Sequence, residues 1–138
     1  MKIPFHKPII PKDFNSITPD SLKNGWLTTG SVAKEFEENI SKYTNSDYVV
    51  AVNSCTAGLH LSLAAKNFNS YDKFIVPTYT FVASVEIGEY LGMQPVLIDC
   101  DENYNIDLNQ IEDILKKDNS IKAIVPVHFA GRPVNMIS

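Results

Sequence analysis

The sequence has little arginine, tryptophan or cysteine and no long apolar run. Its 138 residues include one tryptophan, two cysteines, and twelve lysines or arginines against sixteen acidic residues. With a formal net charge of -4 and Arg132 as the single arginine, no basic block could neutralise a phosphate backbone. Nucleic acid is therefore excluded as an expected partner.

The lack of long apolar runs and of cysteine also limits the expected compartment and metal binding. The N-terminal MKIPFHKPII has no apolar core typical of a signal peptide, and nowhere do about eighteen apolar residues run together. Cys55 and Cys100 stand apart, without a CxxC motif or a neighbouring histidine, which argues against a zinc site and a disulfide scaffold. We expect a cytoplasmic protein without a membrane partner, whose two thiols are reduced and partly buried.

The rest of the composition is ordinary for a globular chain, and short β-rich runs alternate with helical patterns. This alternation predicts a mostly parallel sheet, and valine- and isoleucine-rich runs without strict alternation suit strands that are covered on both faces. The predicted fold is a three-layer α/β domain. The expected strands are Tyr48–Val52, Lys73–Pro77, Gln94–Cys100 and Ile121–His128.

Four helices are expected around these strands. The first begins after Ser31 as N-cap and should lay the stripe of Val32, Phe36, Ile40 and Tyr43 on the sheet. The second spans Thr56–Lys66. The third spans Thr80–Leu91, should be the most buried, and ends at Gly92. The fourth, over residues 107–117, starts with a capping box of Asp107 and Gln110 and should be the most solvated.

The first thirty residues differ from the rest of the chain. Pro4, Pro8, Pro11 and Pro19 favour an extended backbone, apart from one turn over residues 19–24. The predicted organisation is therefore an arm over residues 1–30 followed by a single domain over residues 31–138.

The segment NSCTAG, residues 53–58, joins a predicted strand to a predicted helix. It places Ser54, Thr56 and Ala57 at a helix N-terminus, where unpaired N–H groups and the helix dipole favour an anion. Small residues let a phosphate approach the backbone. Simple capping by Ser54 and Thr56 is the better reading of these residues alone. Neither a P-loop nor a GxGxxG pattern is present.

Several segments together resemble one family in order and spacing. They are GWLTTG, VNSCTAGLHLSL, PTYTFVAS, IDCDENYNID and IVPVHFAG, starting at residues 25, 52, 77, 98 and 124. The family is the DegT/DnrJ/EryC1/StrS family of pyridoxal-phosphate (PLP)-dependent nucleotide-sugar aminotransferases, and the resemblance covers nearly the whole chain. It implies the N-terminal portion, and so an incomplete large domain, of a fold type I, aspartate aminotransferase-like transferase.

The resemblance implies roles in cofactor binding for four residues. Ser54, Thr56 and Ala57 match the helix start that holds the cofactor phosphate, and Phe81 matches an aromatic residue that stacks on the pyridine ring. Core packing on a buried helix is the alternative for Phe81, and spacing alone favours it.

The resemblance further implies that Trp26, Thr28 and Thr29 belong to an active-site loop near the substrate. A glycine-flanked turn anchored by one tryptophan is the alternative. His128 could line the same pocket, although a lone histidine at a strand end is more often structural.

The lysine that binds the cofactor aldehyde and the aspartate that pairs with the pyridine nitrogen come later in relatives, and none of the eleven lysines here lies in such a motif. We expect a chain that is inactive alone, from an enzyme that moves an amino group from glutamate to a keto group of a nucleotide-linked sugar for polysaccharide or glycan synthesis. Some family members are dehydratases, and the deciding position is absent.

Two further classes stay open. One is a non-catalytic module that binds a small phosphorylated ligand, and the other is a vestigial chain that only self-associates. The expected strand Tyr48–Val52 would lack the neighbours that it has in relatives, and an open apolar edge favours pairing with another chain. We therefore expect a homo-oligomer, with an intertwined form as one way to fill the sheet.

Overall fold

The computed structural model describes residues 28–137. The chain divides into two compact units, Met1–Ala51 and Val52–Ser138. In the first unit the described residues form one helix, α2 (Ser31–Thr44), and the second unit contains the sheet. Most of the predicted arm over residues 1–30 lies outside the described residues, including its predicted turn. The division into arm and single domain therefore stays a prediction.

Three parallel strands form the sheet of the second unit. β1 (Lys73–Pro77) lies in the middle and pairs with β2 (Gln94–Ile98) on one side and β3 (Ile121–Ile124) on the other. These are the second, third and fourth predicted strands, so their membership of one parallel sheet is confirmed. β2 and β3 end two and four residues earlier than predicted, and a loop follows each.

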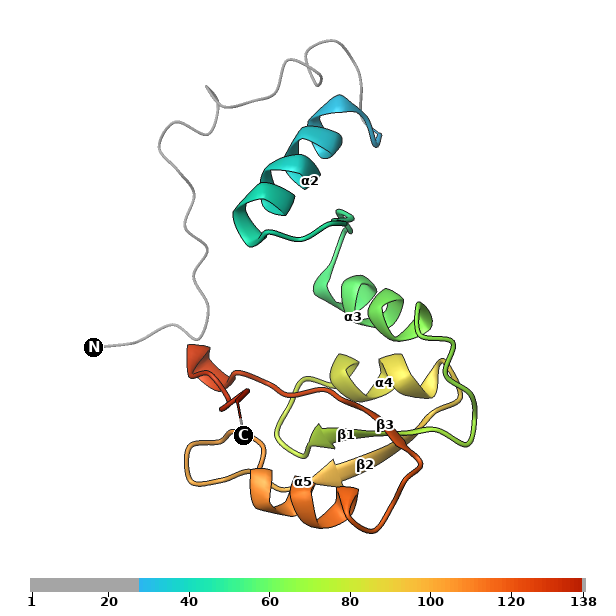
Figure 1. Cartoon of the computed structure of the whole chain (residues 1–138), viewed down its shortest axis with the longest axis vertical. Helices are drawn as coiled ribbons and strands as arrows, with labels where there is room; N and C mark the ends of the chain where they lie inside the picture. The colour runs from blue at the N-terminus through green and yellow to red at the C-terminus, as the bar shows by residue number, and fades with distance from the viewer. Residues whose placement is uncertain (1–27, 138) are drawn as a thin grey trace, which may run out of the picture. The chain divides into compact units, whose positions relative to one another are not determined.

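Helices cover both faces of this sheet (Figure 1). α3 (Cys55–Ala64) and α4 (Ala83–Glu89) lie on one face, and α5 (Leu108–Leu115) lies on the other. The three-layer α/β fold predicted from the alternation of patterns is therefore confirmed. α4 is the most buried of these helices, as expected, and Gly92 ends the turn after it with a φ of 78°.

The core is split by the sheet into two clusters, because successive side chains of a strand point to opposite faces. Phe74 and Val76 of β1 pack on the α4 side with Ile87. Ile75 packs on the α5 side with Ile98, Ile106 and Ile111. All three β1 side chains are fully buried. β1 therefore reads as a continuous apolar run because each of its faces is covered.

One glycine sets the distance between α4 and β1. A Cβ built on Gly88 would lie 2.2 Å from the ring of Phe74, which is closer than atoms can approach. The absence of a side chain at Gly88 therefore lets α4 lie directly over the most buried aromatic ring of the sheet.

The prediction of a strand over Tyr48–Val52 is wrong. These residues have no regular secondary structure, and Tyr48 and Val50 are 92% and 74% exposed. A strand needs a neighbour to satisfy its backbone groups, and no described residue pairs with this segment. The N–H of Ala51 instead donates to the carboxylate of Glu37 in α2 at 2.8 Å.

The predictions for α2 are partly wrong. Gly30, not Ser31, is the N-cap, and no residue of α2 is buried. The apolar stripe of α2 is largely exposed, with Val32 at 45% and Phe36 at 54%, and its packing on the sheet stays a prediction. α2 rather than α5 is the most solvated of the described helices, because α5 buries Ile111.

Asp107 caps the start of α5 as expected, but the predicted capping box is not formed, because the Asp107 N–H donates to the Asp99 carbonyl at 3.1 Å. The Asp107 carboxylate accepts hydrogen bonds from the N–H groups of Asn109 and Gln110, and the Gln110 side chain donates to it at 2.9 Å. The Gln110 amide is the main reason that the pKa of Asp107 is lowered, followed by the Asn109 N–H. The cap fixes the point at which the chain turns from β2 into the helix that covers the second face.

Candidate functional site

The N-terminus of α3 is formed by the predicted phosphate cradle. Ser54 is the N-cap, and its hydroxyl accepts a hydrogen bond from the Ala57 N–H at 3.2 Å. Thr56 is exposed and Ala57 is half-buried. Within the described residues, the N–H groups of Cys55 and Thr56 have no protein acceptor, as expected for the first turn of a helix. Capping thus belongs to Ser54, while two amides and the Thr56 hydroxyl remain available to an anion.

Cys55 differs from its prediction. It was expected to be partly buried, and the structure exposes it at the first residue of α3. Its neighbours Ser54 and Thr56 are exposed as well, so these three side chains at the start of α3 face solvent.

Phe81 was predicted inside the helix Thr80–Leu91, but it precedes the observed helix α4. α4 begins at Ala83, and residues 78–82 form the turn between β1 and α4, in which the Ser84 N–H donates to the Phe81 carbonyl at 3.0 Å. The ring of Phe81 is 75% exposed. Core packing was the alternative for this residue, and the structure removes it. The flat face of the ring is accessible for stacking.

The cradle and Phe81 lie at the same end of the sheet. α4 follows β1 directly, and α3 ends shortly before β1 begins, so both helices run opposite to β1 and start where the strands finish (Figure 1). In parallel sheets this end is where ligands bind, because the loops and helix N-termini meet there. The fold thus brings the two parts of the predicted cofactor site to one edge.

The three residues predicted to lie near the substrate all precede α2 in the chain. Trp26 lies outside the described residues. Thr28 and Thr29 are exposed in the bend that leads to Gly30, in the first unit. Their roles stay predictions.

His128 has the structural role that its position favoured. Its Nδ1 atom accepts a hydrogen bond from the Val134 N–H at 3.0 Å, which fastens the segment after β3.

Sequence reasoning missed four residues at the same edge, namely Tyr79, Tyr104, Phe129 and Asn105. The three aromatic rings contact one another, and the Asn105 side chain is buried and hydrogen-bonded between two loops. All four lie within segments that were quoted for the family resemblance. Their position after the ends of strands was the signal that could have singled them out.

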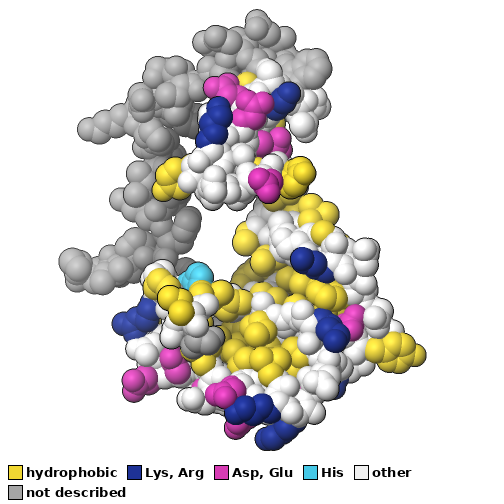
Figure 2. All heavy atoms as spheres, in the orientation of Figure 1, with side chains coloured by type: hydrophobic (Ala, Val, Ile, Leu, Met, Phe, Trp, Pro, Cys, Tyr) yellow, Lys and Arg dark blue, Asp and Glu magenta, His cyan; other side chains and the backbone are white. Residues whose placement is uncertain are grey.

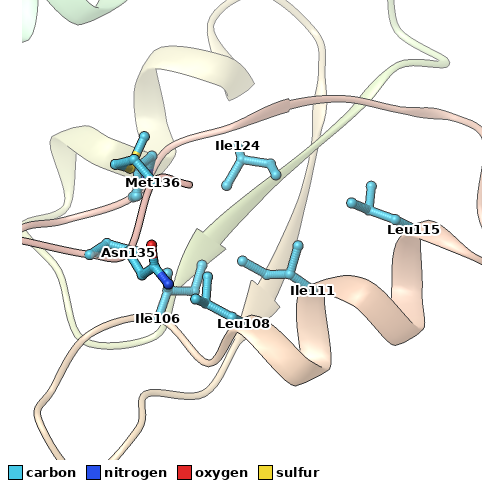
Figure 3. A pocket seen from close by; sticks show the side chains of 9 residues that line it. Ile106, Leu108, Ile111, Leu115, Ile124, Asn135 and Met136 are labelled. Atoms are coloured by element: carbon cyan, nitrogen blue, oxygen red, sulfur yellow. The ribbon is translucent and has the colours of Figure 1, made fainter. Parts of the chain in front are cut away.

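A separate cavity of about 280 Å³ lies between α5, β3 and the C-terminal segment (Figure 3). It contains none of the predicted site residues and is lined almost wholly by apolar side chains. Figure 2 shows hydrophobic side chains gathered over the sheet between the helices of this unit. Leu115 and Ile124, at the cavity, are 41% and 42% exposed, so α5 covers the β3 side of the sheet incompletely.

Metal-binding clusters and membrane spans are both absent from residues 28–137. No group of three or more histidine, cysteine, aspartate or glutamate side chains is placed to hold a metal ion in this part of the chain. No helix among these residues is long and apolar enough to cross a membrane.

Comparison with known families gives one clear match. The model of the DegT/DnrJ/EryC1/StrS aminotransferase family matches residues 8–138. This interval includes every predicted site residue and all the helices and strands described above.

Individual relatives agree with this match. The chain is 35% identical to the UDP-4-amino-4-deoxy-L-arabinose–oxoglutarate aminotransferase of Shewanella sediminis, over 97% of this chain and 34% of the relative. It is 36% identical to the spore coat polysaccharide biosynthesis protein SpsC of Bacillus subtilis, with the same coverage. The chain thus spans about a third of the length of these curated relatives.

A solved structure shows the same fold. The PLP form of a putative sugar aminotransferase from Streptococcus pneumoniae superposes with a TM-score of 0.86 at 33% sequence identity. The match covers 98% of this chain and 34% of that one. The shared α/β fold is therefore that of a PLP-dependent aminotransferase.

Proposed function

Because this chain belongs to the DegT/DnrJ/EryC1/StrS aminotransferase family, whose members are PLP-dependent, we propose that it is the cofactor-cradling part of a sugar aminotransferase. The observation that carries the proposal is the shared edge of the sheet. There the free amides at the start of α3 and the exposed ring of Phe81 lie on neighbouring elements.

The residues present fit PLP. The cofactor phosphate suits the N–H groups of Cys55 and Thr56 and the Thr56 hydroxyl, because both residues are exposed at a helix N-terminus. A planar pyridine ring suits the open face of Phe81. When bound, PLP supplies the electron sink that amino-group transfer requires. The residues of this chain hold and orient it.

The substrate is proposed to be a nucleotide-linked sugar with a keto group, and the amino donor to be glutamate. The names of the relatives support a sugar substrate used in polysaccharide synthesis. Trp26, Thr28 and Thr29 would contact this substrate, on the strength of the family resemblance of their segment. No lysine of this chain matches the family's cofactor-binding motif, so we propose that this chain alone does not transfer the amino group.

A titration with PLP tests the proposal directly. The purified chain should bind PLP saturably, as followed by calorimetry, without an absorbance band that borohydride abolishes. Inorganic phosphate should compete for the same site. Absence of both PLP and phosphate binding would mean that the cradle is not functional in this chain.

The same titration weighs the alternative of a non-catalytic module for small phosphorylated ligands. The free amides of α3 favour phosphate binding whatever group the phosphate carries. If simple sugar phosphates bind as tightly as PLP, the stacking role of Phe81 fails and the module is favoured. Tighter binding of PLP than of these competitors favours the aminotransferase.

Self-association and cytoplasmic location complete the proposal. Tyr48, Val50 and Val52 are exposed apolar residues in one short segment, and such surface is usually covered by a partner. We expect a homo-oligomer. Light scattering at micromolar concentration would detect it, and a monomer in that measurement would contradict it.

The proposed location is the cytoplasm. Both cysteines are free, which suits a reducing compartment.

A further inference from the structure

Three aromatic rings outside the proposed cofactor site contact one another at the same edge of the sheet and form what we name the strand-end cluster. Tyr79 follows β1, Tyr104 lies in the loop after β2, and Phe129 follows β3. The ring centroids lie 5.0 Å apart for Tyr79 and Phe129, 5.4 Å for Tyr104 and Phe129, and 5.7 Å for Tyr79 and Tyr104. Tilted rings at these separations attract one another.

A buried amide holds two of the three loops together beneath the rings. Asn105 is 6% exposed, and its Oδ1 accepts a hydrogen bond from the Phe129 N–H at 3.3 Å. Its Nδ2 donates to the carbonyl oxygens of Arg132 and Pro133 at 3.4 and 3.3 Å. The loop after β2 and the segment after β3 are therefore fastened to each other independently of the rings.

The loop after β1 has a different connection. The Thr78 N–H donates to the Ile98 carbonyl at 2.8 Å, and beyond this point the Tyr79 ring contacts Tyr104 and Phe129. The Thr78 hydroxyl donates to the Asp99 carboxylate at 3.4 Å, and the Thr80 hydroxyl donates to the Ser84 hydroxyl in the first turn of α4 at 2.8 Å. Tyr79 is thus the residue that ties the middle of this turn to the rest of the edge.

The backbone of Tyr104 indicates that its ring is important. Its φ is 62°, in the left-handed region that bulky residues rarely adopt. The Tyr104 N–H donates to the Asp101 carbonyl at 3.0 Å, and the Asp101 carboxylate accepts from the Asn105 N–H. Glycine would fit this conformation without strain. A tyrosine in such a place suggests that its ring contacts offset the strain.

We propose that the strand-end cluster positions residues 78–82, and with them Phe81, for stacking on the cofactor. Tyr79 lies two residues before Phe81. Because the Phe81 ring is 75% exposed, its own packing does not orient it. The inference rests on the proposed function, in which Phe81 stacks on PLP. The cluster members are positioning residues, since they act through the turn.

Amide hydrogen exchange of the ligand-free chain tests this inference without any cofactor. Tyr104→Gly removes the ring and the backbone strain together, so the melting temperature should change little. The amides of Thr78, Ser84 and Val85 should exchange roughly 2- to 13-fold faster, the factor that corresponds to the loss of the Tyr79–Tyr104 contact, one of the two ring contacts that hold the turn. Tyr104→Phe should restore the slow exchange.

Two further variants check the result, one inside the cluster and one outside it. Phe129→Leu removes a different ring of the cluster while keeping an apolar side chain, and it should accelerate exchange of the same amides. Tyr71→Ala removes a tyrosine that is 83% exposed in the turn before β1, and it should leave these amides unchanged. Unchanged exchange in both Tyr104→Gly and Phe129→Leu would overturn the inference.

Cofactor binding gives a second, separable readout. Tyr104→Gly should weaken PLP binding and reduce the circular dichroism induced in the bound ring, while inorganic phosphate binds as in the unmodified chain, because the cradle lies on another loop. Equal loss of phosphate binding would contradict a role through Phe81. If the unmodified chain does not bind PLP, the proposed function fails, and the exchange rates still decide whether the cluster holds the turn.

Discussion

Ser54 and Thr56 are two residues apart but should respond to substitution in opposite ways. The Ser54 hydroxyl caps α3, so Ser54→Ala should lower the free energy of unfolding by about 1 kcal/mol. The Thr56 hydroxyl is exposed and bonds to no described residue, so Thr56→Ala should leave stability unchanged and weaken phosphate binding by about 1.5–3 kcal/mol.

Urea denaturation and phosphate calorimetry on the two variants separate these effects. Ser62→Ala, later in α3, is a matched control, because its hydroxyl bonds only to the Gly58 carbonyl of its own helix. If Thr56→Ala lowered stability and left phosphate affinity intact, Thr56 would be a capping residue only.

Phe81 and Phe74 provide a second contrast between residues of the same type. Phe81 is 75% exposed and Phe74 is fully buried. Phe81→Ala should change the free energy of unfolding by less than about 0.5 kcal/mol, and Phe74→Ala should lower it by about 3–5 kcal/mol. Denaturant midpoints measure both. A large loss of stability in Phe81→Ala would mean that its ring is packed.

At the scale of an element, the close contact of α4 with β1 depends on Gly88. Gly88→Ala places a methyl group against the buried Phe74 ring, which has no room to move, and should lower the free energy of unfolding by about 1–3 kcal/mol or more. Thermal unfolding of the single variant and of Gly88→Ala with Phe74→Leu would check this. The smaller leucine side chain should partly relieve the clash, and strict additivity of the two losses would contradict the contact.

The helices and strands also differ in how well the sequence pattern predicted their bounds. The apolar run of β1 and the Asp107 cap of α5 depend on neighbours in the sequence, and both were predicted. The start of α4 was not, because Phe81 and Val82 are apolar but face solvent in the turn before the helix. Hydrophobic periodicity counts apolar residues and cannot distinguish an exposed aromatic ring from a core residue.

At the scale of the whole molecule, the pH dependence of stability should show the contact between Asp118 and Lys73. The Lys73 ammonium donates to the Asp118 carboxylate at 2.7 Å and joins the loop after α5 to the start of β1. This hydrogen bond, followed by those from Ser120, holds the pKa of Asp118 well below its ordinary value of 3.8.

As the pH falls, the unfolded chain therefore takes up a proton at Asp118 at a higher pH than the folded chain does. The contribution to stability is complete above about pH 5 and is lost as the pH falls from there toward the folded pKa. Unfolding measured between about pH 2 and pH 5 should show a shallower acid decline in Asp118→Asn than in the unmodified chain. Asp113→Asn, on the exposed side of α5, is the control. Equal declines in all three proteins would contradict the prediction.

The sequence by itself determined the α/β class, the three parallel strands, the cap of α3 and the family, because these follow from local patterns and from segments in fixed order. Only the tertiary structure decided that Tyr48–Val52 forms no strand, that Phe81 is exposed, and that Tyr79, Tyr104 and Phe129 meet. A strand needs a partner, and burial and ring contacts depend on residues far apart in the chain. Such pairings are properties of the folded chain, which no short segment contains.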